Sequence, residues 1–580
     1  MNAKKYFSKI NSVKQKQYEA LKMYYAEGKT AKEVAVVFGY KHRGFTTIIE
    51  DFIKALKNDD EEDYFFKEIK KGRKVSVQID GLKDVIIKLR KKYYSIQEIK
   101  GILDATGRVV SEAIIYKTTK EAGFARLPRR TKLAKRELGL PKIQAPVSKK
   151  ISGKTEKIKS TSAGILSLLP YIKKYKIDKA IENSSYPETK TLDKLNSILA
   201  FVALKASDMR RYSCDDKWCM DRGLGLFAGL NALPKAAWFT SYSHRVTTDI
   251  NINFLKSLQN IWSENNLLGD TSNLDFTTIP YWGNDEHLEN NWSGKRTKAL
   301  PSMLAVLAHD PDSGIINYGN TNVVHKEESN EVLKFLDFYH SGKSKNKQLR
   351  YIVFDSKFTS YQNLGRLNND GVKFITIRRR CKSLVDRLNK IPSKERKKVR
   401  VEMAGNKKRT LNIYEEEVSL NGYDGIVRQV CITGHGKIKP AVIITNDFGL
   451  SAAEIVRRYA RRWIVEKAIS EQIDFFHLNS VSSSMVIKVD FDLTMSILTH
   501  NIFRLFSKDL ERYSHLSDRS IYEKFLLNEA DIEIQNNEIS ISLKKKRNLP
   551  LILENTRKYN HIKYQWINNS QLGFSGASYS

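Results

Sequence analysis

The segments NLDFTTIPY (273–281), RYIVFD (350–355) and VKFITIR (372–378) decide the fold of this 580-residue chain. Short apolar runs of this kind predict buried β-strands. Two more strand-like runs, MLAVLAH and GIINY, follow the first segment, and helical patterns separate the last three strands. The sequence therefore predicts three strands followed by a helix, a strand, a second helix and a final strand.

This order is that of an RNase H-like α/β core with a mixed sheet, which we expect over residues 266–380. Basic, strand-like segments follow, so residues 381–447 are predicted to form a β-rich insertion. A long helix then returns the chain to the core within residues 448–510, and residues 511–580 are assigned only as a C-terminal region. The predicted fold class is multidomain α/β.

The chain is strongly basic, with 99 Lys and Arg against 65 Asp and Glu and a formal charge of +34. Such an excess indicates a polyanionic partner. The hydrophobic fraction of 41% is that of a folded protein, and at roughly 100–200 residues per domain the length implies several domains. The four cysteines show no disulfide or zinc spacing, which favours a reducing cytoplasm. No stretch approaches the length of about 18 apolar residues that spans a membrane.

Two N-terminal segments share one pattern of three short helices. In the first, Thr30 and Glu33 have the spacing of a capping box at a helix start, and Ser95 and Glu98 repeat it in the second. Gly28 and Gly39 separate the helices of the first segment, and Gly107 marks a turn in the second. The pattern predicts tandem helix-turn-helix units.

We expect the first helix-turn-helix unit within residues 1–60 and the second within residues 75–125. In a chain of this charge, such units are typical of DNA recognition. Lys41 and Arg43, at the start of the third helix of the first unit, are candidate DNA contacts. The alternative is a pair of three-helix bundles with a structural role only.

Residues 126–164 are predicted to be a basic linker. Between residues 126 and 160 there are twelve Lys or Arg and two acidic residues, with three prolines interspersed. Such a segment would follow a phosphate backbone, and Arg129 and Arg130 are candidate contacts; a solvated surface without a ligand is the alternative. Residues 165–265 have a mainly helical pattern.

A second basic stretch opens the predicted insertion. Residues 378–409 contain fourteen Lys or Arg and three acidic residues. Arg378, Arg379 and Arg380 are its first candidate DNA contacts, and the stretch would form a DNA-binding surface beside the core. A basic surface that only faces solvent is again the alternative.

Two strand aspartates are candidates for metal-dependent phosphodiester chemistry. Such chemistry needs carboxylates that hold divalent cations about 3.5–4 Å apart. Asp275 lies within the first strand and Asp355 ends the fourth, so neighbouring parallel strands would bring them together. Either aspartate alone is more often a turn or cap residue.

The helix predicted from about Ser451 to Phe475 supplies a third carboxylate. Tyr459, Arg462 and Glu466 are spaced by three and four residues, which places them on one helical face. Glu466 would point toward the strand aspartates, and Tyr459 and Arg462 toward the substrate.

The spacing Tyr-(2)-Arg-(3)-Glu resembles the signature of bacterial insertion-sequence DDE transposases that have a β-rich insertion before the glutamate. DFTTIPYWG around Asp275 and FDSKFTSYQNL around Asp355 also fit, as does Trp463 after the arginine. The resemblance covers about residues 270–480. It departs at Ile473, where this family has a lysine.

This resemblance implies that Asp275, Asp355 and Glu466 bind two Mg²⁺ ions, with Mn²⁺ as a substitute, and that Tyr459 and Arg462 contact DNA. The implied function is that of a DNA transposase, which binds terminal inverted repeats, cleaves the strand at the element's end and transfers it.

The implied partners are double-stranded DNA, as transposon ends and as target, and further copies of the chain in a homodimer or higher oligomer on paired ends. The implied location is the bacterial cytoplasm, at the nucleoid, with no membrane contact. A domesticated transposase that only binds DNA is one alternative. The other is an RNase H-type nuclease, which would need neither the tandem units nor the insertion.

Overall fold

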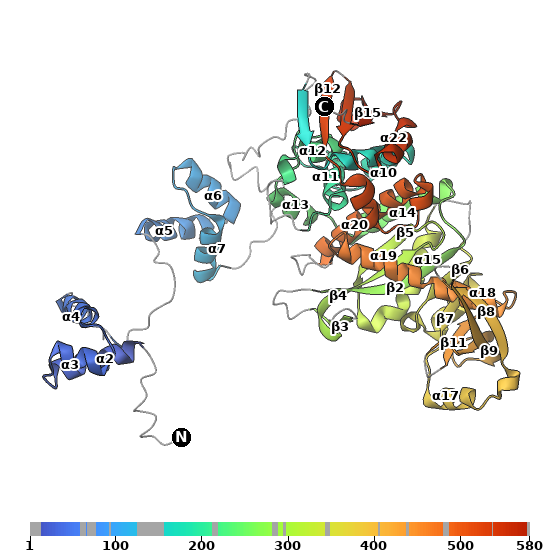
Figure 1. Cartoon of the computed structure of the whole chain (residues 1–580), viewed down its shortest axis with the longest axis horizontal. Helices are drawn as coiled ribbons and strands as arrows, with labels where there is room; N and C mark the ends of the chain where they lie inside the picture. Colours follow the sequence, from blue (N-terminus) through green and yellow to red (C-terminus); the bar gives the residue numbers. More distant parts are fainter. Residues whose placement is uncertain are drawn as a thin grey trace. The chain divides into compact units, whose positions relative to one another are not determined.

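A computed structural model gives the fold of the protein (Figure 1). It describes residues 13–57, 65, 77–91, 94–124, 156–210, 218–280, 288–293, 297–342, 349–403, 407–436, 440–478, 486–535 and 537–576. The chain forms two compact units, Met1–Ile143 and Gln144–Ser580.

The first unit begins with three helices, α2 (Val13–Tyr25), α3 (Ala31–Val37) and α4 (His42–Lys57). The capping box is confirmed: Thr30 Oγ1 accepts the Glu33 N–H at 3.4 Å, and Glu33 Oε2 accepts the Thr30 N–H at 2.9 Å. The helices enclose a small apolar core of Ala20, Leu21, Val34, Ala35, Phe45 and Ile49.

A second group of three helices follows, formed by α5 (Val77–Lys91), α6 (Ile96–Ala105) and α7 (Glu112–Glu121). The second capping box is also present, with the Ser95 N–H donated to Glu98 Oε2 at 2.6 Å. This group has its own core of Ile86, Ile99, Leu103, Val110 and Ile115.

The predicted basic linker ends earlier than the sequence suggested. Residues 125–155, and with them Arg129 and Arg130, lie outside the described residues. Strand β1 (Glu156–Ser160) pairs with a strand near the C-terminus, and the short helix η1 begins at Ala163. Residues 156–164 are therefore part of the second unit, because their backbone is used in a sheet.

Helices dominate the first hundred residues of the second unit. They are η1 (Ala163–Leu168), α9 (Leu169–Lys174), α10 (Ile177–Asn183), α11 (Lys194–Ala206), η2 (Trp218–Met220), α12 (Arg222–Phe227), α13 (Ala236–Ser243) and α14 (Thr248–Glu264). Helix α11 is largely apolar and is buried from Leu195 to Ala206. It packs on a later helix, α20 (Val486–Lys508), which makes this block part of the main core.

A mixed sheet carries the central part of the second unit, with five strands in the order β5-β4-β2-β6-β7. Pairing is parallel between β2 and β6 and between β6 and β7, and antiparallel elsewhere among the five. The strands are β2 (Thr271–Pro280), β4 (Lys298–His309), β5 (Ile316–Val323), β6 (Tyr351–Phe354) and β7 (Lys373–Ile377); the short β3 (Asn290–Ser293) pairs with β4. The connections contain η3 (His325–Asn330), α15 (Glu331–His340), η4 (Ser356–Phe358) and α16 (Tyr361–Asn369).

The β-rich segment expected as an insertion continues this same sheet. Strand β11 (Ala441–Thr445) pairs antiparallel with β7, and β10 (Ile426–Thr433), β9 (Lys407–Ser419) and β8 (Lys397–Met403) follow outward. The segment also contains helix α17 (Lys382–Asn389) and the short η5 (Ser393–Glu395). We call β8–β11 the sheet extension.

The single helix predicted from Ser451 to Phe475 is two helices. Helix α18 (Ala452–Arg461) and helix α19 (Trp463–Asp474) meet at Arg462. A capping box of Ser451 and Glu454 starts the first of them. The break matters because Arg462 stands at the junction.

The C-terminal region forms a second sheet, in the order β1-β12-β13-β15-β14 (Figure 1). Its elements are η7 (Glu511–Tyr513), α21 (Asp518–Ile521), η8 (Tyr522–Leu526), β12 (Ala530–Gln535), β13 (Glu538–Leu543), α22 (Leu549–Arg557), β14 (Lys563–Tyr564), η9 (Gln565–Ile567) and β15 (Ser570–Gly576). Among the described helices of both units, none has the length and apolar character to cross a membrane.

Candidate active site

The register of the parallel strands β2 and β6 brings two candidate aspartates together. The last aligned pair is Leu274 with Phe354, and Asp275 and Asp355 are the next residues of the two segments. Neighbouring strands lie about 4.8 Å apart, and residues at the same height point to the same face. The predicted juxtaposition of the two aspartates is therefore a direct consequence of the register.

Local contacts hold both carboxylates. Asp275 Oδ1 accepts the N–H of Phe276 at 2.9 Å, and Asp355 Oδ1 caps η4 by accepting the N–H of Ser356 at 2.6 Å. The rings of Phe276 and Phe358 stack with centroids 3.9 Å apart. This stacking joins the segments that follow the two aspartates.

One face of β2 contacts the end of α18 at every second residue, because side chains of a strand alternate between its faces. Arg458 Nη1 donates to Thr271 Oγ1 at 2.7 Å, Asn273 Nδ2 to the carbonyl of Arg461 at 3.1 Å, and Arg462 Nη1 to Asp275 Oδ2 at 2.5 Å. The strand therefore fixes the end of the helix above the aspartates.

The guanidinium of Arg462 bridges two of the candidate carboxylates. Besides Asp275, it donates from Nη2 to Glu466 Oε1 at 2.8 Å. The Arg462 side chain is 7% exposed, against 16% for Asp275 and 43% for Glu466. The sequence directed this arginine toward the substrate, but here it neutralises carboxylates, because buried like charges need a counter-cation.

Asp275 lies close enough to Asp355 and Glu466 for their negative charges to affect its pKa. Burial raises the pKa of Asp275 to about 6; the Arg462 cation opposes this shift, and the negative charges of Glu466 and Asp355 add to it. A site that presents three carboxylates to one another favours a bound cation. Oxygen donors of this kind are also the ligands that Mg²⁺ and Mn²⁺ prefer, so the donor set fits divalent metal ions.

Tyr459 and the arginines at the end of β7 differ in their access to this site. Tyr459 is half-buried, with the Arg462 guanidinium 5.7 Å from its ring, and burial raises its pKa to about 12. Arg379 donates to the carbonyl of Ser356, next to Asp355, at 3.3 Å. It is therefore the basic residue of this group that lies beside the carboxylates.

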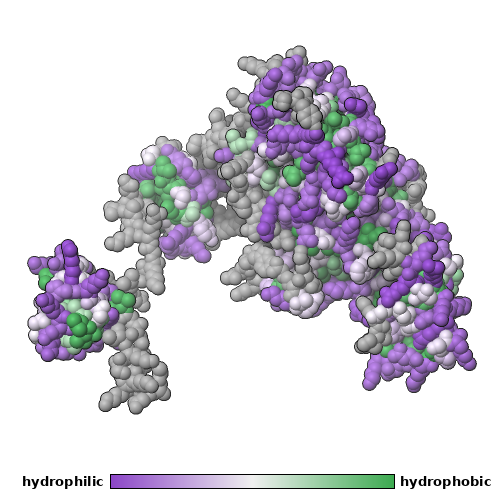
Figure 2. Space-filling view, viewed as in Figure 1, coloured by the Kyte–Doolittle hydropathy of each residue, from purple (hydrophilic) through white to green (hydrophobic). Residues whose placement is uncertain are grey.

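The other predicted DNA contacts lie elsewhere. Arg378 donates to Gln429 and Arg380 to the carbonyl of Pro440, so both hold the sheet extension to the core. Hydrophilic residues cover most of the visible face of that extension and of α17 (Figure 2). In the first unit, Lys41 and Arg43 are exposed at the start of α4. Their role in DNA binding stays a prediction.

Ile473 is the position where the resembling family has a lysine. Its side chain packs against the main apolar core of the second unit. The helical period of α19 explains this, because Ile469 and Gln472 lie on the same side of the helix and are buried. A lysine head group at this position would have to leave the core to reach a phosphate.

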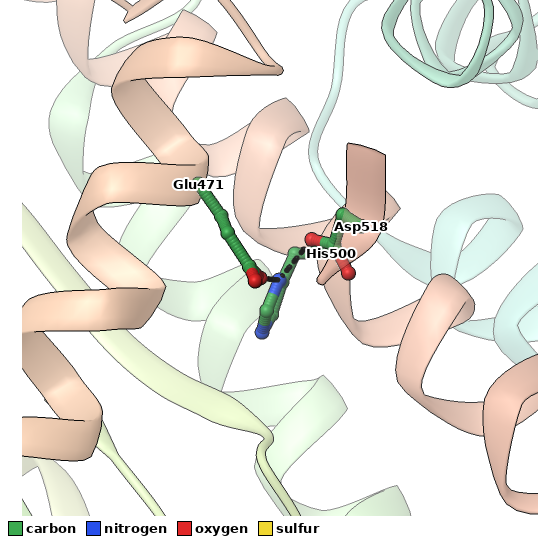
Figure 3. A group of neighbouring side chains, drawn as sticks. All are labelled: Glu471, His500 and Asp518. Atoms are coloured by element: carbon green, nitrogen blue, oxygen red, sulfur yellow. Dashed lines mark hydrogen bonds and ion pairs between the residues drawn. The ribbon is translucent and has the colours of Figure 1, made fainter. Parts of the chain in front are cut away.

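Sequence reasoning missed a buried ionic cluster behind α19, formed by Glu471, His500 and Asp518 (Figure 3). His500 Nδ1 lies 2.5 Å from Asp518 Oδ2 and 3.7 Å from Glu471 Oε2, and Arg504 Nη2 lies 2.5 Å from Asp518 Oδ1. No spacing in the sequence predicts this cluster, because its members come from three different helices. The cluster ties α19 to α20 and α21.

The charges of this cluster are shifted by burial and by one another. Burial raises the pKa of Glu471 to about 7, with help from the nearby Asp518. Burial alone would lower the pKa of His500, but the Asp518 carboxylate outweighs it and raises that pKa. The three ligand atoms lie within 4.8 Å of one another, yet His500 and Arg504 already supply the positive charge, which favours an ion-pair network.

Residues 270–502 match the family model of the transposase DDE domain. The match spans all three candidate carboxylates and the sheet extension between them. The chain therefore carries a DDE-type transposase domain, and the protein is an enzyme of this type that acts in DNA transposition. DDE transposases use divalent metal ions.

No curated protein matches the sequence. Among solved structures, a cryo-EM structure of a piggyBac transposase synaptic complex with hairpin DNA is similar, at 12% identity and a TM-score of 0.34, over 64% of this chain and 82% of that chain. A TM-score this low does not assign a shared fold.

Proposed function

We propose that the protein is an insertion-sequence transposase that cleaves DNA at the ends of its element and transfers the freed strand to target DNA. Asp275, Asp355 and Glu466 would be the metal ligands of an RNase H-like core. The observation that carries this proposal is the register of β2 and β6, with Arg462 bridging from Asp275 to Glu466.

In this proposal the three carboxylates would hold two Mg²⁺ ions, with Mn²⁺ as a substitute. When bound, the metals activate the attacking oxygen and stabilise the leaving one. Asp275 and Asp355 are rigid because each also accepts a backbone N–H. Glu466 is the more exposed of the two carboxylates that contact Arg462, so its side chain can change position as the substrate enters.

Arg462 would act in two ways. Without metal it compensates Asp275 and Glu466, and with DNA present its guanidinium could turn to a phosphate oxygen, which is a similar bidentate acceptor. Tyr459 and Arg379 would contact the same strand on either side of the carboxylates.

The first unit would read the terminal inverted repeats. Each of its two groups has three helices with a capped middle helix, and Lys41 and Arg43 would contact the backbone. Pairing of two ends would need a homodimer or higher oligomer, acting on the bacterial nucleoid.

A domesticated protein that binds DNA without cutting is the second candidate. Against it stands the arrangement of the carboxylates, which a DNA-binding role alone does not need. The test is cleavage of duplexes that carry the element's inverted repeats, in Mg²⁺, by the wild type and by Asp355→Asn. We expect the substitution to abolish cleavage and to leave DNA binding intact. Cleavage by Asp355→Asn at the wild-type rate would refute the assignment.

A further inference from the structure

The loop between strand β13 and helix α22 gathers positive charge in the C-terminal region of the second unit. Its sequence is Lys544-Lys545-Lys546-Arg547-Asn548, so four cations follow one another between two regular elements. Figure 1 shows the C-terminal sheet and α22 at the opposite end of this unit from the sheet extension. The loop is therefore a basic surface separate from the one at the start of the extension.

The loop is held in place by the short helix η8. Lys546 Nζ donates to the carbonyl of Glu523 at 2.7 Å and to the carbonyl of Leu527. Asn548 Nδ2 donates to the carbonyl of Lys524 at 3.5 Å. These bonds satisfy carbonyls that the end of a helix leaves open. The loop therefore has a defined shape, and its cations have defined positions.

A pocket of about 370 Å³ lies between the loop and η8. Three cations and one carboxylate are among the residues that line it, which are Tyr513, Glu523, Lys524, Lys546, Arg547 and Asn548. Lys524 and Arg547 are exposed, and within the described part of the chain neither forms an ion pair. The carboxylate of Glu523 lies 3.9 Å from Arg519, so it is shared with a cation outside the pocket.

We propose that this pocket, which we call the C-terminal cation site, binds the phosphate backbone of duplex DNA. Carbonyl groups hold the Lys546 ammonium but do not cancel its charge, so the lining keeps a positive surplus. Helix α22 begins at the loop without a side-chain cap, and the positive end of its dipole adds to the surplus. The inference rests on the proposed function, because DNA is the polyanion that a transposase handles.

The lining predicts contact with the backbone of DNA and not with its bases. Lys and Arg side chains bind phosphates of any sequence, and such contacts position a duplex without reading it. Each contact releases counterions, so the binding constant falls with salt concentration by a fixed slope. The C-terminal cation site should therefore strengthen binding to DNA of any sequence, and its share can be measured from that slope.

The test measures binding of the full-length chain to a duplex of arbitrary sequence at several salt concentrations. Metal-free buffer prevents cleavage during the measurement. The test variant is Lys524→Gln/Arg547→Gln. The control variant is Lys544→Gln/Arg366→Gln, which removes the same charge from two exposed side chains that already pair with carboxylates. Lys544 belongs to the same loop, so the control also matches the test variant in place.

The measured quantity is the slope of the logarithm of the binding constant against the logarithm of the salt concentration. We expect the slope of the test variant to be shallower than that of the wild type by about 0.9 to 1.8, which corresponds to one or two lost phosphate contacts. The control variant should keep the wild-type slope. Both variants should melt like the wild type, since the changed side chains are exposed.

A wild-type slope in the test variant would overturn the inference. An equal loss in the control variant would also overturn it, because net charge alone would then explain the change. Both results would leave the proposed function standing, since that proposal depends on cleavage at the three carboxylates. A wild type that binds no duplex at all would instead contradict the proposed function, and this inference with it.

Discussion

Replacing Arg462 by alanine should destabilise the junction of α18 and α19 more than replacing a neighbouring arginine would. The guanidinium makes hydrogen bonds to Asp275 at 2.5 Å and Glu466 at 2.8 Å. Its removal leaves the Asp275 carboxylate, which is 16% exposed, without its counter-charge. Breaking a buried ion pair by removal of one partner is strongly destabilising.

The size of the effect follows from burial. A hydrogen bond to a charged group contributes about 1.5–3 kcal/mol. The bond to Asp275 counts almost fully, whereas the bond to Glu466 must be discounted because that side chain is 43% exposed. We therefore expect the local opening free energy to fall by about 3 kcal/mol, which is roughly a 100-fold faster amide exchange in this region.

Hydrogen–deuterium exchange of the full-length chain measures this directly, through peptides that cover α18 and α19. Arg461→Ala is the matched control, since Arg461 is adjacent but pairs at the surface, 42% exposed, with Asp312, 53% exposed. Such a pair contributes about 0–1 kcal/mol. Equal exchange in the two variants would refute the role given to Arg462.

Divalent metal gives the same prediction a second, independent outcome. If the three carboxylates bind Mg²⁺ or Mn²⁺, the metal can replace the missing guanidinium as counter-charge. Metal should then restore protection in Arg462→Ala by more than it adds to the wild type, where it must compete with the arginine. An identical response of both proteins would show that the carboxylates do not hold metal.

Three further predictions concern parts outside the site. Ile473→Lys should destabilise the second unit by about 1–3 kcal/mol in thermal melting, because a cation would enter an apolar contact; unchanged melting would show that the side chain can leave the core. The packing of α19 on the buried cluster should weaken as pH rises from about 5 to 8. The pKa of Glu471 is raised to about 7 and that of His500 is also raised, so the folded state holds more protons than the unfolded state. Hydrogen exchange of α19 peptides measured against pH tests this, and Glu471→Gln should flatten the pH dependence. A fragment of residues 1–124 should bind the element's inverted repeats with an affinity that falls steeply with salt, and binding that ignores sequence would contradict the recognition role.

The parts of the site that the sequence predicts are those encoded by local patterns. Asp275 lies within one apolar strand run and Asp355 directly follows another, and the order of the strands brings parallel neighbours together. The spacing of Tyr459, Arg462 and Glu466 fixes a shared helical face. Each of these inferences needs only the period of a helix or a strand.

The parts that the sequence did not predict depend on distant partners. The spacing predicts the helical face on which Arg462 lies. It does not predict that, without substrate, the Arg462 guanidinium pairs with the carboxylates of Asp275 and Glu466. Strand β1 was assigned to a linker because its partner β12 lies more than 350 residues further along the chain. His500 and Asp518 meet Glu471 through packing of three helices, which no local pattern announces.

The sheet extension connects these observations, because it supports the helix that carries the site. Its strands and α18 share an apolar core in which Ile455 and Val456 pack on residues such as Val401, Leu411 and Val430. Arg378 and Arg380 donate hydrogen bonds to groups of the extension. Helix α18 is thus fixed by the extension at its start and by β2 at its end, where Arg462 meets Asp275. The height of Glu466 above the strand aspartates is therefore set from both ends, so the extension has a role in positioning the third carboxylate that does not depend on any contact with DNA.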